Sequence, residues 1–181
     1  MADLTFVGIS GSLRQASRNT GLLRCCAAHL PAGVRMEIAD ISALPFYNAD
    51  LEKPKAAQAL IEQVSRADAL VLACPEYNYS LAPALKNALD WLSREPNLAP
   101  LNGKAACLLG AGGGMGSSRS QYHLRQVCVY LNLCLLNKPE VFSNAFGPAF
   151  ADNGDVQEPG LTKQVADLMQ ALADRTRQLR A

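Results

Sequence analysis

Short apolar runs of β type alternate with longer segments of helical period along the chain. The run Ala69–Cys74 is apolar at every position, which is typical of a central strand covered on both faces. Five strands are expected, at Leu4–Ile9, Val34–Asp40, Ala69–Cys74, Ala105–Leu109 and Cys134–Leu136, the last continuing toward Phe142. Five helices are expected, at Thr20–Leu30, Pro54–Arg66, Ala82–Arg94, Arg119–Leu131 and Leu161–Arg177. This alternation predicts an α/β protein with a parallel sheet between two layers of helices.

Five parallel strands joined by right-handed crossovers are expected to form a doubly wound sheet of order 2-1-3-4-5. This is the flavodoxin-like three-layer α/β/α sandwich, and we expect residues 1–181 to form one such domain. In that order, the connections leaving strands 1 and 3 run to opposite faces of the sheet. A crevice then opens at the carboxyl ends of strands 1, 3 and 4, so the three loops that follow these strands are the candidate binding loops.

The overall charge gives no sign of a polyanionic partner. The chain carries 17 basic and 16 acidic residues, a formal net charge of +1. This near-balance argues against bulk attraction to nucleic acid or to a membrane surface. No basic segment followed by a long apolar run opens the chain, and no stretch approaches the roughly 20 apolar residues of a membrane span. We therefore expect a cytoplasmic protein.

The six cysteines and two histidines do not suggest a metal site or a catalytic pair. The cysteines fall mostly inside apolar elements and show no C-x-x-C spacing, so buried reduced thiols are expected. His29 and His123 fall on expected helices rather than in the crevice loops, and we expect both to be structural. With no nucleophile and base to pair, a bound cofactor should carry any reaction.

The loop after the first strand is rich in groups that bind phosphate. Ser10, Ser12 and Ser17 offer hydroxyls and Asn19 an amide, and the first N–H groups of the next helix lie beside them. Arg14 can add a charge-assisted hydrogen bond. Alternatively, Ser17 or Asn19 only caps the helix. Neither the Walker lysine nor G-x-G-x-x-G spacing is present, so a mononucleotide with a terminal phosphate fits better than a dinucleotide.

The other two loops suit a flat ligand. The third expected strand leads into P-E-Y-N-Y-S, residues 75–80, whose tyrosine rings and backbone groups can border a heterocycle. A plain turn with a helix cap is the alternative for this segment. The fourth strand leads into residues 110–118, where five glycines among the first seven residues permit a close backbone approach, or else form a flexible surface loop.

These same residues carry a family resemblance. G-S-L-R-x-x-S-x-N, P-E-Y-N-Y-S with L-K-N-A-L-D-W-L-S-R, and R-S-Q-Y-H-L-R-Q-V followed by L-N-K-P-E resemble the NADPH-dependent FMN reductases. The similarity runs from Phe6 into the last helix, and the soluble bacterial NAD(P)H quinone and chromate reductases look most similar.

The resemblance implies bound FMN with NADPH or NADH as co-substrate, usually in a homodimer or homotetramer. It places the FMN phosphate on Ser12, Leu13, Arg14, Ser17 and Asn19. It places the isoalloxazine ring beside Pro75, Glu76, Tyr77, Asn78 and Tyr79. The third loop touches the flavin at about Ala111 and Gly112, where relatives often have a serine, so backbone contacts are expected here. The segments 87–94 and 119–130 look like subunit contacts. Trp91 is a candidate for the interface or the crevice wall, with ordinary core packing as the alternative.

The expected activity follows from this implied cofactor. Hydride passes from NAD(P)H to FMN, and quinones, free flavin, chromate or similar small acceptors are then reduced in the same crevice by a ping-pong scheme. One alternative is a flavodoxin-type electron carrier that binds FMN without reacting with NAD(P)H, although the neutral charge and the phosphate loop count against it. The other is a nucleotide-binding regulatory domain without redox chemistry.

Overall fold

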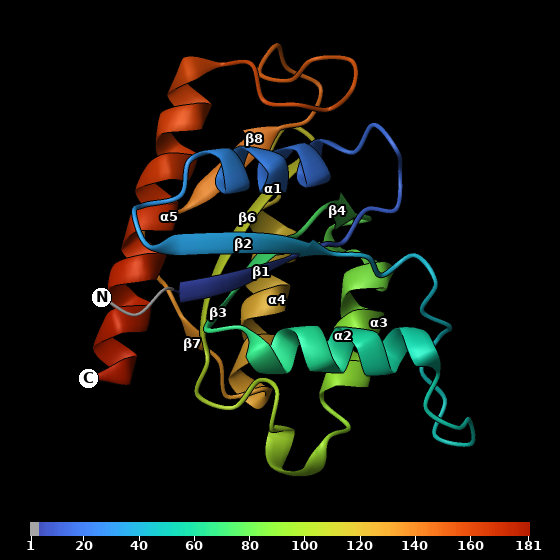
Figure 1. Cartoon of the computed structure of the whole chain (residues 1–181). Helices are drawn as coiled ribbons and strands as arrows, with labels where there is room; N and C mark the ends of the chain where they lie inside the picture. Colours follow the sequence, from blue (N-terminus) through green and yellow to red (C-terminus); the bar gives the residue numbers. More distant parts are fainter. Residues whose placement is uncertain (1–3) are drawn as a thin grey trace.

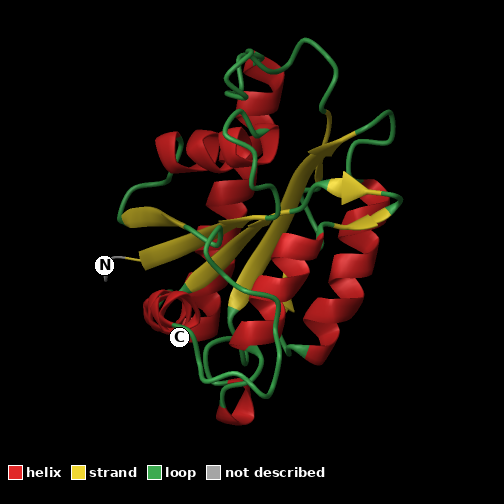
Figure 2. Ribbon diagram, turned by 90° about the vertical axis from the view of Figure 1, so that its right-hand side faces the viewer, coloured by secondary structure: helices red, strands yellow, loops and turns green. Residues whose placement is uncertain are grey.

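The computed structural model describes residues 4–181, and the first three residues of the expected domain lie outside this range. A parallel sheet forms the middle layer (Figures 1 and 2). Its strands are β1 (Leu4–Ser10), β2 (Val34–Ala39), β3 (Ala69–Ala73), β6 (Ala105–Gly112), β7 (Cys134–Leu135) and β8 (Val141–Asn144). The order is β2-β1-β3-β6-β7, with β8 also paired to β6, which confirms the predicted 2-1-3-4-5 arrangement.

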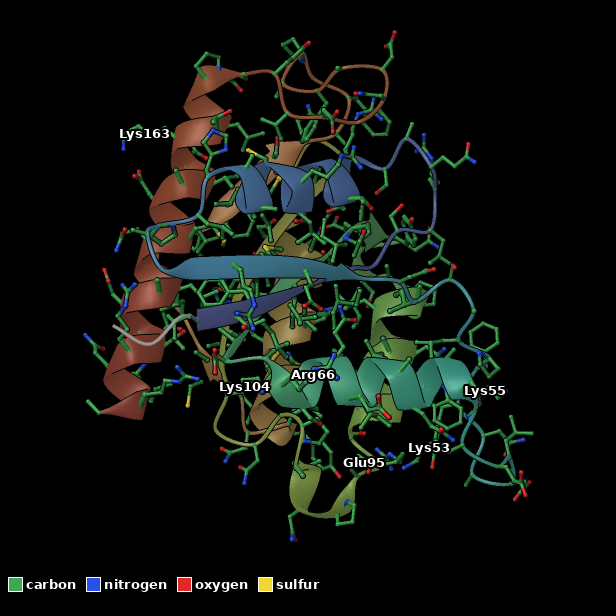
Figure 3. All side chains as sticks on the ribbon, in the orientation of Figure 1. Lys53, Lys55, Arg66, Glu95, Lys104 and Lys163 are labelled. Atoms are coloured by element: carbon green, nitrogen blue, oxygen red, sulfur yellow. The ribbon has the colours of Figure 1, made fainter. Side chains whose placement is uncertain are left out.

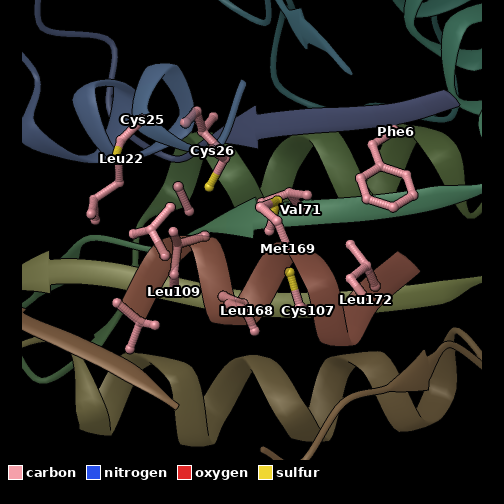
Figure 4. Packing of buried hydrophobic residues seen from close by; sticks show 14 of the residues in the cluster. Phe6, Leu22, Cys25, Cys26, Val71, Cys107, Leu109, Leu168, Met169 and Leu172 are labelled. Atoms are coloured by element: carbon pink, nitrogen blue, oxygen red, sulfur yellow. The ribbon is translucent and has the colours of Figure 1, made fainter. Parts of the chain in front are cut away.

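Helices cover both faces of the sheet (Figure 2). They are α1 (Arg18–Ala28), α2 (Lys55–Arg66), α3 (Pro83–Leu92), α4 (Ser118–Tyr130) and α5 (Pro159–Arg180), with a short 3-10 turn η1 (Pro96–Leu98) after α3. The buried side chains form two clusters, one under α1 and α5 and the other under α2, α3 and α4. Figure 4 shows Phe6, Val71 and Cys107 of the sheet packed with Leu168 and Met169 of α5.

The apolar period of α5 explains how this helix covers the sheet. Leu161, Val165, Leu168 and Leu172 are buried in the core, as their helical spacing predicts. Leu179, which continues the same period, is exposed near the end of the helix. The apolar stripe therefore covers the sheet only along the earlier turns of α5.

The last predicted strand is in fact two strands. β7 pairs with the start of β6 through Ala105↔Cys134, and β8 pairs with its end through Leu109↔Val141. Pro139 lies between them and has no N–H to donate, which suits a break in the ladder. β8 brings a fourth loop, the one after Asn144, to the carboxyl edge of the sheet.

A small antiparallel hairpin follows β3 where a loop was expected. β4 (Glu76–Tyr77) and β5 (Ser80–Leu81) are joined by a two-residue turn at Asn78 and Tyr79. Both turn residues have positive φ, 49° and 65°, as a type I′ turn requires. Asparagine adopts this region readily and a tyrosine does so at a cost, so the contacts of Tyr79 must hold it there.

Polar contacts tie the outer elements together. The Nζ of Lys104 donates to the carbonyls of Val64, at 2.9 Å, and Ala67, at the end of α2. Lys53 and Glu95, labelled in Figure 3, form an ion pair between the segments before α2 and after α3. Between residues 4 and 181 there is no helix both long and apolar enough to cross a membrane.

Trp91 belongs to the core rather than to an interface or the crevice wall. It is buried, and its Nε1 donates to the carbonyl of Pro45 at 2.9 Å. The ring of Tyr47 packs edge-on against it, with centroids 5.1 Å apart. Trp91 therefore anchors the segment after β2 against α3.

Five of the six cysteines are buried, and Cys134 is partly exposed. All six are free thiols. Burial raises the pKa of Cys74 to about 11 and that of Cys128 to about 12, and it also raises the pKa of Cys107. These thiols are neutral at physiological pH, in line with the expected structural role.

Candidate functional site

A cavity of about 210 Å³ opens at the carboxyl ends of β1, β3, β6 and β8. The three predicted crevice loops all reach it, because parallel strands end at the same edge of the sheet. Nine of the twelve predicted contact residues line it: Ser12, Arg14, Ser17, Asn19, Pro75, Glu76, Tyr77, Ala111 and Gly112. The other three, Leu13, Asn78 and Tyr79, lie outside its lining.

At one end of the cavity, hydroxyl groups shape the loop between β1 and α1. Ser17 caps α1, its Oγ accepting from the N–H of Thr20 at 3.2 Å. Ser10 is used inside the loop, where its Oγ accepts from Thr20 Oγ1 at 3.0 Å. The hydroxyl of Ser12 and the first N–H groups of α1 remain to bind a ligand. Ser17 thus caps the helix, as the alternative interpretation of this loop allowed, and Asn19 does not.

Arg18 lines the same end of the cavity and was not predicted. It is the first residue of α1, and its Nε is buried with no hydrogen-bond partner among residues 4–181. A buried donor on a cation is costly unless an acceptor satisfies it. Together with Arg14, this group fits an anion at the start of α1. In the sequence, the only sign of this role is that a second arginine follows Arg14, between Ser17 and Asn19.

Asn19 joins two of the loops. Its Nδ2 donates to the carbonyl of Ala111 at 3.0 Å, and its Oδ1 accepts from the N–H of Ala111 at 2.9 Å. The side chain is buried, with 5% of the residue exposed. The amide expected to bind phosphate is therefore used to hold α1 against the end of β6.

The other end of the cavity has a flat backbone wall. A Cβ on Gly112 would lie 1.8 Å from the carbonyl oxygen of Gly116, so no larger residue fits there without a shift. A Cβ on Gly113 would meet nothing within 4 Å, so this backbone faces open space in the cavity. Pro75 and Tyr77 line the same cavity as these glycines. A planar ring can approach such a wall closely.

Two further lining residues come from the loop after β8, which was not recognised as part of the site. Ala145 donates its N–H to the carbonyl of Gly112 at 2.6 Å. Phe146 is 82% exposed as a residue and lines the cavity. Dividing the last strand into β7 and β8 in the sequence would have pointed to this loop, because a parallel strand beside β6 ends at the same edge.

Glu76 has a structural partner rather than an open carboxylate. Its side chain is 4% exposed and accepts from the N–H groups of Arg119, at 3.1 Å, and Ser120, at 3.3 Å, at the start of α4. The Nε of Arg119 also donates to it at 2.6 Å, and this bond raises the pKa of the guanidinium. Glu76 thereby fastens the hairpin to α4.

Arg119 also accounts for the position of Tyr79. Its guanidinium lies over the Tyr79 ring, 3.6 Å from the centroid. This contact holds the strained turn residue beside α4, and Tyr79 is not among the residues that line the cavity. The ring expected to border a ligand therefore packs on the arginine that binds Glu76.

The two histidines lie in structural contacts, as expected. His123 Nδ1 is 2.9 Å from Ser80 Oγ and joins α4 to β5, while His29 Nδ1 is 2.9 Å from the carbonyl of Cys25. In residues 4–181 there is no group of three His, Cys, Asp or Glu side chains placed to hold a metal ion.

The residues present fit FMN. Arg14, Arg18, Ser12 and the start of α1 form a cationic, donor-rich end suited to a phosphate dianion. The glycine backbone and the aromatic side chains form an end suited to a flat heterocycle. The Nε of Arg18, which has no hydrogen-bond partner in the described range 4–181, is an independent sign that an anion belongs at the first end.

Comparison with known proteins places the chain among flavoenzymes. The family model described as NADPH-dependent FMN reductase matches residues 4–147. A Pseudomonas aeruginosa protein named NAD(P)H-dependent FMN reductase is 44% identical over 98% of both chains. A Solanum tuberosum protein named NAD(P)H:quinone oxidoreductase is 43% identical over 91% of this chain and 89% of its own. The solved structure of FerB from Paracoccus denitrificans, a flavoenzyme NAD(P)H:(acceptor) oxidoreductase, is similar with a TM-score of 0.87 at 26% identity, covering 97% of this chain and 98% of that one.

Proposed function

The chain belongs to the NADPH-dependent FMN reductase family, and on this premise we propose that its cavity holds FMN while NAD(P)H is oxidised and a small acceptor is reduced. The acceptors that suit it are quinones, free flavin, chromate and similar oxidants that can enter an open crevice. The observation that carries the proposal is the buried Nε of Arg18, which no described residue satisfies, in a cavity that is also lined by glycine backbone.

Each end of the cavity has a separate task. Arg14, Arg18 and Ser12, with the start of α1, bind the phosphate of FMN and fix the molecule along the crevice. Gly112 and Gly113 on one side, with Pro75 and Tyr77 on the other, border the ring. Asn19 and Glu76 act as positioning residues, because their hydrogen bonds hold these walls together. Leu13, Asn78 and Tyr79 stay predicted contacts at the edge of the site.

FMN when bound supplies the redox chemistry, accepting a hydride from NAD(P)H and giving electrons to the acceptor. The chain orients the reactants and offers backbone N–H groups that stabilise negative charge on the reduced cofactor. No side chain needs to act as a general acid or base. Because both substrates use one crevice, they bind in turn, which gives ping-pong kinetics.

The oligomeric state is proposed from the family resemblance, and the location from the sequence. We propose a homodimer or homotetramer in the cytoplasm. Helix α4 supports a subunit contact, since Tyr122, Val129 and Tyr130 are large exposed side chains on it. Segment 87–94 supports one less well, because Asn87, Leu89 and Trp91 are buried inside the subunit.

Spectroscopy and steady-state kinetics test the proposal. The purified protein, incubated with FMN and passed through a desalting column, should stay yellow and should oxidise NADPH or NADH when a quinone is added. Initial rates measured against nicotinamide concentration, at several fixed quinone concentrations, should give parallel double-reciprocal lines. A protein that retains no FMN and oxidises neither nicotinamide would disprove the proposed function.

A further inference from the structure

A second cavity, of about 260 Å³, lies on the other side of the loop after β1. It opens at the carboxyl ends of β1 and β2, between that loop and residues 38–42. Ser12 and Arg14 line both this cavity and the FMN cavity. The two spaces therefore adjoin, and one extended ligand can reach from one into the other past Arg14.

One wall of this second cavity is apolar and exposed. Leu13 is 58% exposed and Ile38 is 36% exposed, and both line the cavity. Leu13 lies between the polar residues Ser12 and Arg14, and its exposure shows that core packing does not explain an apolar side chain at this position. Two branched aliphatic side chains beside a hollow suit the face of a heterocyclic base.

The same cavity is lined by an acid, Asp40. Oδ1 of Asp40 accepts from the N–H of Ser42 at 2.9 Å, and because a carboxylate has about four acceptor sites, further hydroxyl donors can still bind it. The bond from Ser42 also lowers the pKa of Asp40, which keeps the carboxylate ionised. The nearby hydroxyls of Ser10 and Thr20 bond to each other instead. The charged groups on this cavity are thus Asp40 at one end and Arg14 at the other.

We propose that this second cavity binds the adenosine-diphosphate half of the nicotinamide dinucleotide. The adenine lies against Leu13 and Ile38, the ribose hydroxyls donate to Asp40, and the diphosphate lies near Arg14. An ionised acid at the end of the second strand of a doubly wound sheet is suited to the 2′-hydroxyl of a ribose. The inference rests on the proposed function, since it assigns a place to the co-substrate.

A preference between the two nicotinamides follows. The 2′-phosphate of NADPH would place negative charge beside the Asp40 carboxylate, whereas the 2′-hydroxyl of NADH donates to it. The cavity therefore favours NADH. Replacing Asp40 by asparagine keeps an oxygen for Ser42 and removes the charge, so this change should relax the preference.

Calorimetric titration with ADP-ribose tests the site without turnover, because this compound lacks the nicotinamide. FMN-loaded protein should bind ADP-ribose more tightly than 2′-phospho-ADP-ribose. Asp40→Asn should reduce the ratio of the two affinities by about tenfold, whereas Asp167→Asn, a remote exposed acid on α5, should leave it unchanged. The same shift should appear in the ratio of kcat/KM for NADH and NADPH.

A second variant tests the location. Ser42 is exposed on the cavity rim, so Ser42→Trp should fill the space and abolish ADP-ribose binding while FMN binding persists. Unchanged ADP-ribose affinity in Ser42→Trp, or an unchanged affinity ratio in Asp40→Asn, would overturn the inference. If the variant still binds FMN and oxidises NAD(P)H, such a result would refute only the location of the adenosine-diphosphate half and not the proposed function.

Discussion

The side-chain amide of Asn19 forms two hydrogen bonds with the backbone of Ala111, one to its carbonyl and one from its N–H. The pair joins the start of α1 to the end of β6, elements 92 residues apart in the chain. The backbone of Ala111, near the end of β6, is thereby fixed relative to the proposed phosphate end of the cavity. Several properties of the site should depend on this link.

Asn19→Asp should weaken both folding and cofactor binding. The new carboxylate cannot donate to the Ala111 carbonyl, and it places a negative charge in a buried position beside the phosphate end. A loss of about 2 kcal/mol in the free energy of unfolding is expected from urea denaturation. Asn19→Ala, which removes the bonds without adding charge, should retain FMN better than Asn19→Asp. Equal FMN affinity in the two variants would contradict this placement of the phosphate.

Arg18→Gln should reduce FMN affinity by about tenfold, because it removes a charge-assisted contact to the phosphate. Riboflavin, which has no phosphate, should lose far less affinity. Quenching of flavin fluorescence measures both. Arg24→Gln on the same helix is the matched control, since Arg24 pairs with Asp155 outside the FMN cavity. An effect of equal size for riboflavin would show that Arg18 does not bind the phosphate.

Two adjacent glycines should respond differently to alanine. Gly112→Ala should destabilise the fold by about 2 kcal/mol or more, because its Cβ would meet the Gly116 carbonyl. Gly113→Ala should leave the melting temperature nearly unchanged and weaken FMN binding by about tenfold, because its methyl group enters space the ring needs. Thermal melts of the FMN-free protein and FMN titrations separate the two effects. A Gly113→Ala variant with normal FMN affinity would place the ring elsewhere.

Stability should decrease as pH rises above 9, in part through Cys74. Its folded pKa of about 11 lies above the ordinary thiol value of 9.0, so its contribution is fully present below pH 9 and is lost as pH rises to about 11. About 3 kcal/mol of unfolding free energy is involved. Urea denaturation at pH 8, 9, 10 and 11 measures it, and Cys74→Ala should show a shallower decline. Parallel pH profiles for the two proteins would contradict this role for Cys74.

The sheet and most of the cavity could be predicted from the sequence because both depend on local patterns. Apolar runs such as Ala69–Cys74 identify the central strands, and the order of elements fixes which loops share an edge. The flavodoxin-like arrangement predicted in this way is confirmed, and so is the family, which was expected from the resemblance of the loop and helix motifs. So is the expectation of an oxidoreductase that uses FMN and NAD(P)H, which the family membership carries.

The features of the site that could not be predicted from the sequence depend on contacts between residues far apart in the chain. Pro139 alone does not show that β7 and β8 each pair with β6, and without that pairing Ala145 and Phe146 were not assigned to the site. The use of the Asn19 amide depends on the Ala111 backbone, which is brought to it by the fold. Likewise, Tyr79 is turned toward α4 by Arg119, a contact that the residues near Tyr79 do not encode.

The central claim is that this chain reacts directly with a nicotinamide through FMN bound in the cavity. Anaerobic stopped-flow mixing of the FMN-loaded protein with NADH or NADPH alone should bleach the flavin absorbance, and a second mixing with quinone should restore it. Arg18→Gln should bleach normally when FMN is saturating, since Arg18 binds the phosphate and not the ring. Flavin that stays oxidised with both nicotinamides would contradict the account and indicate a carrier that needs a separate reductase.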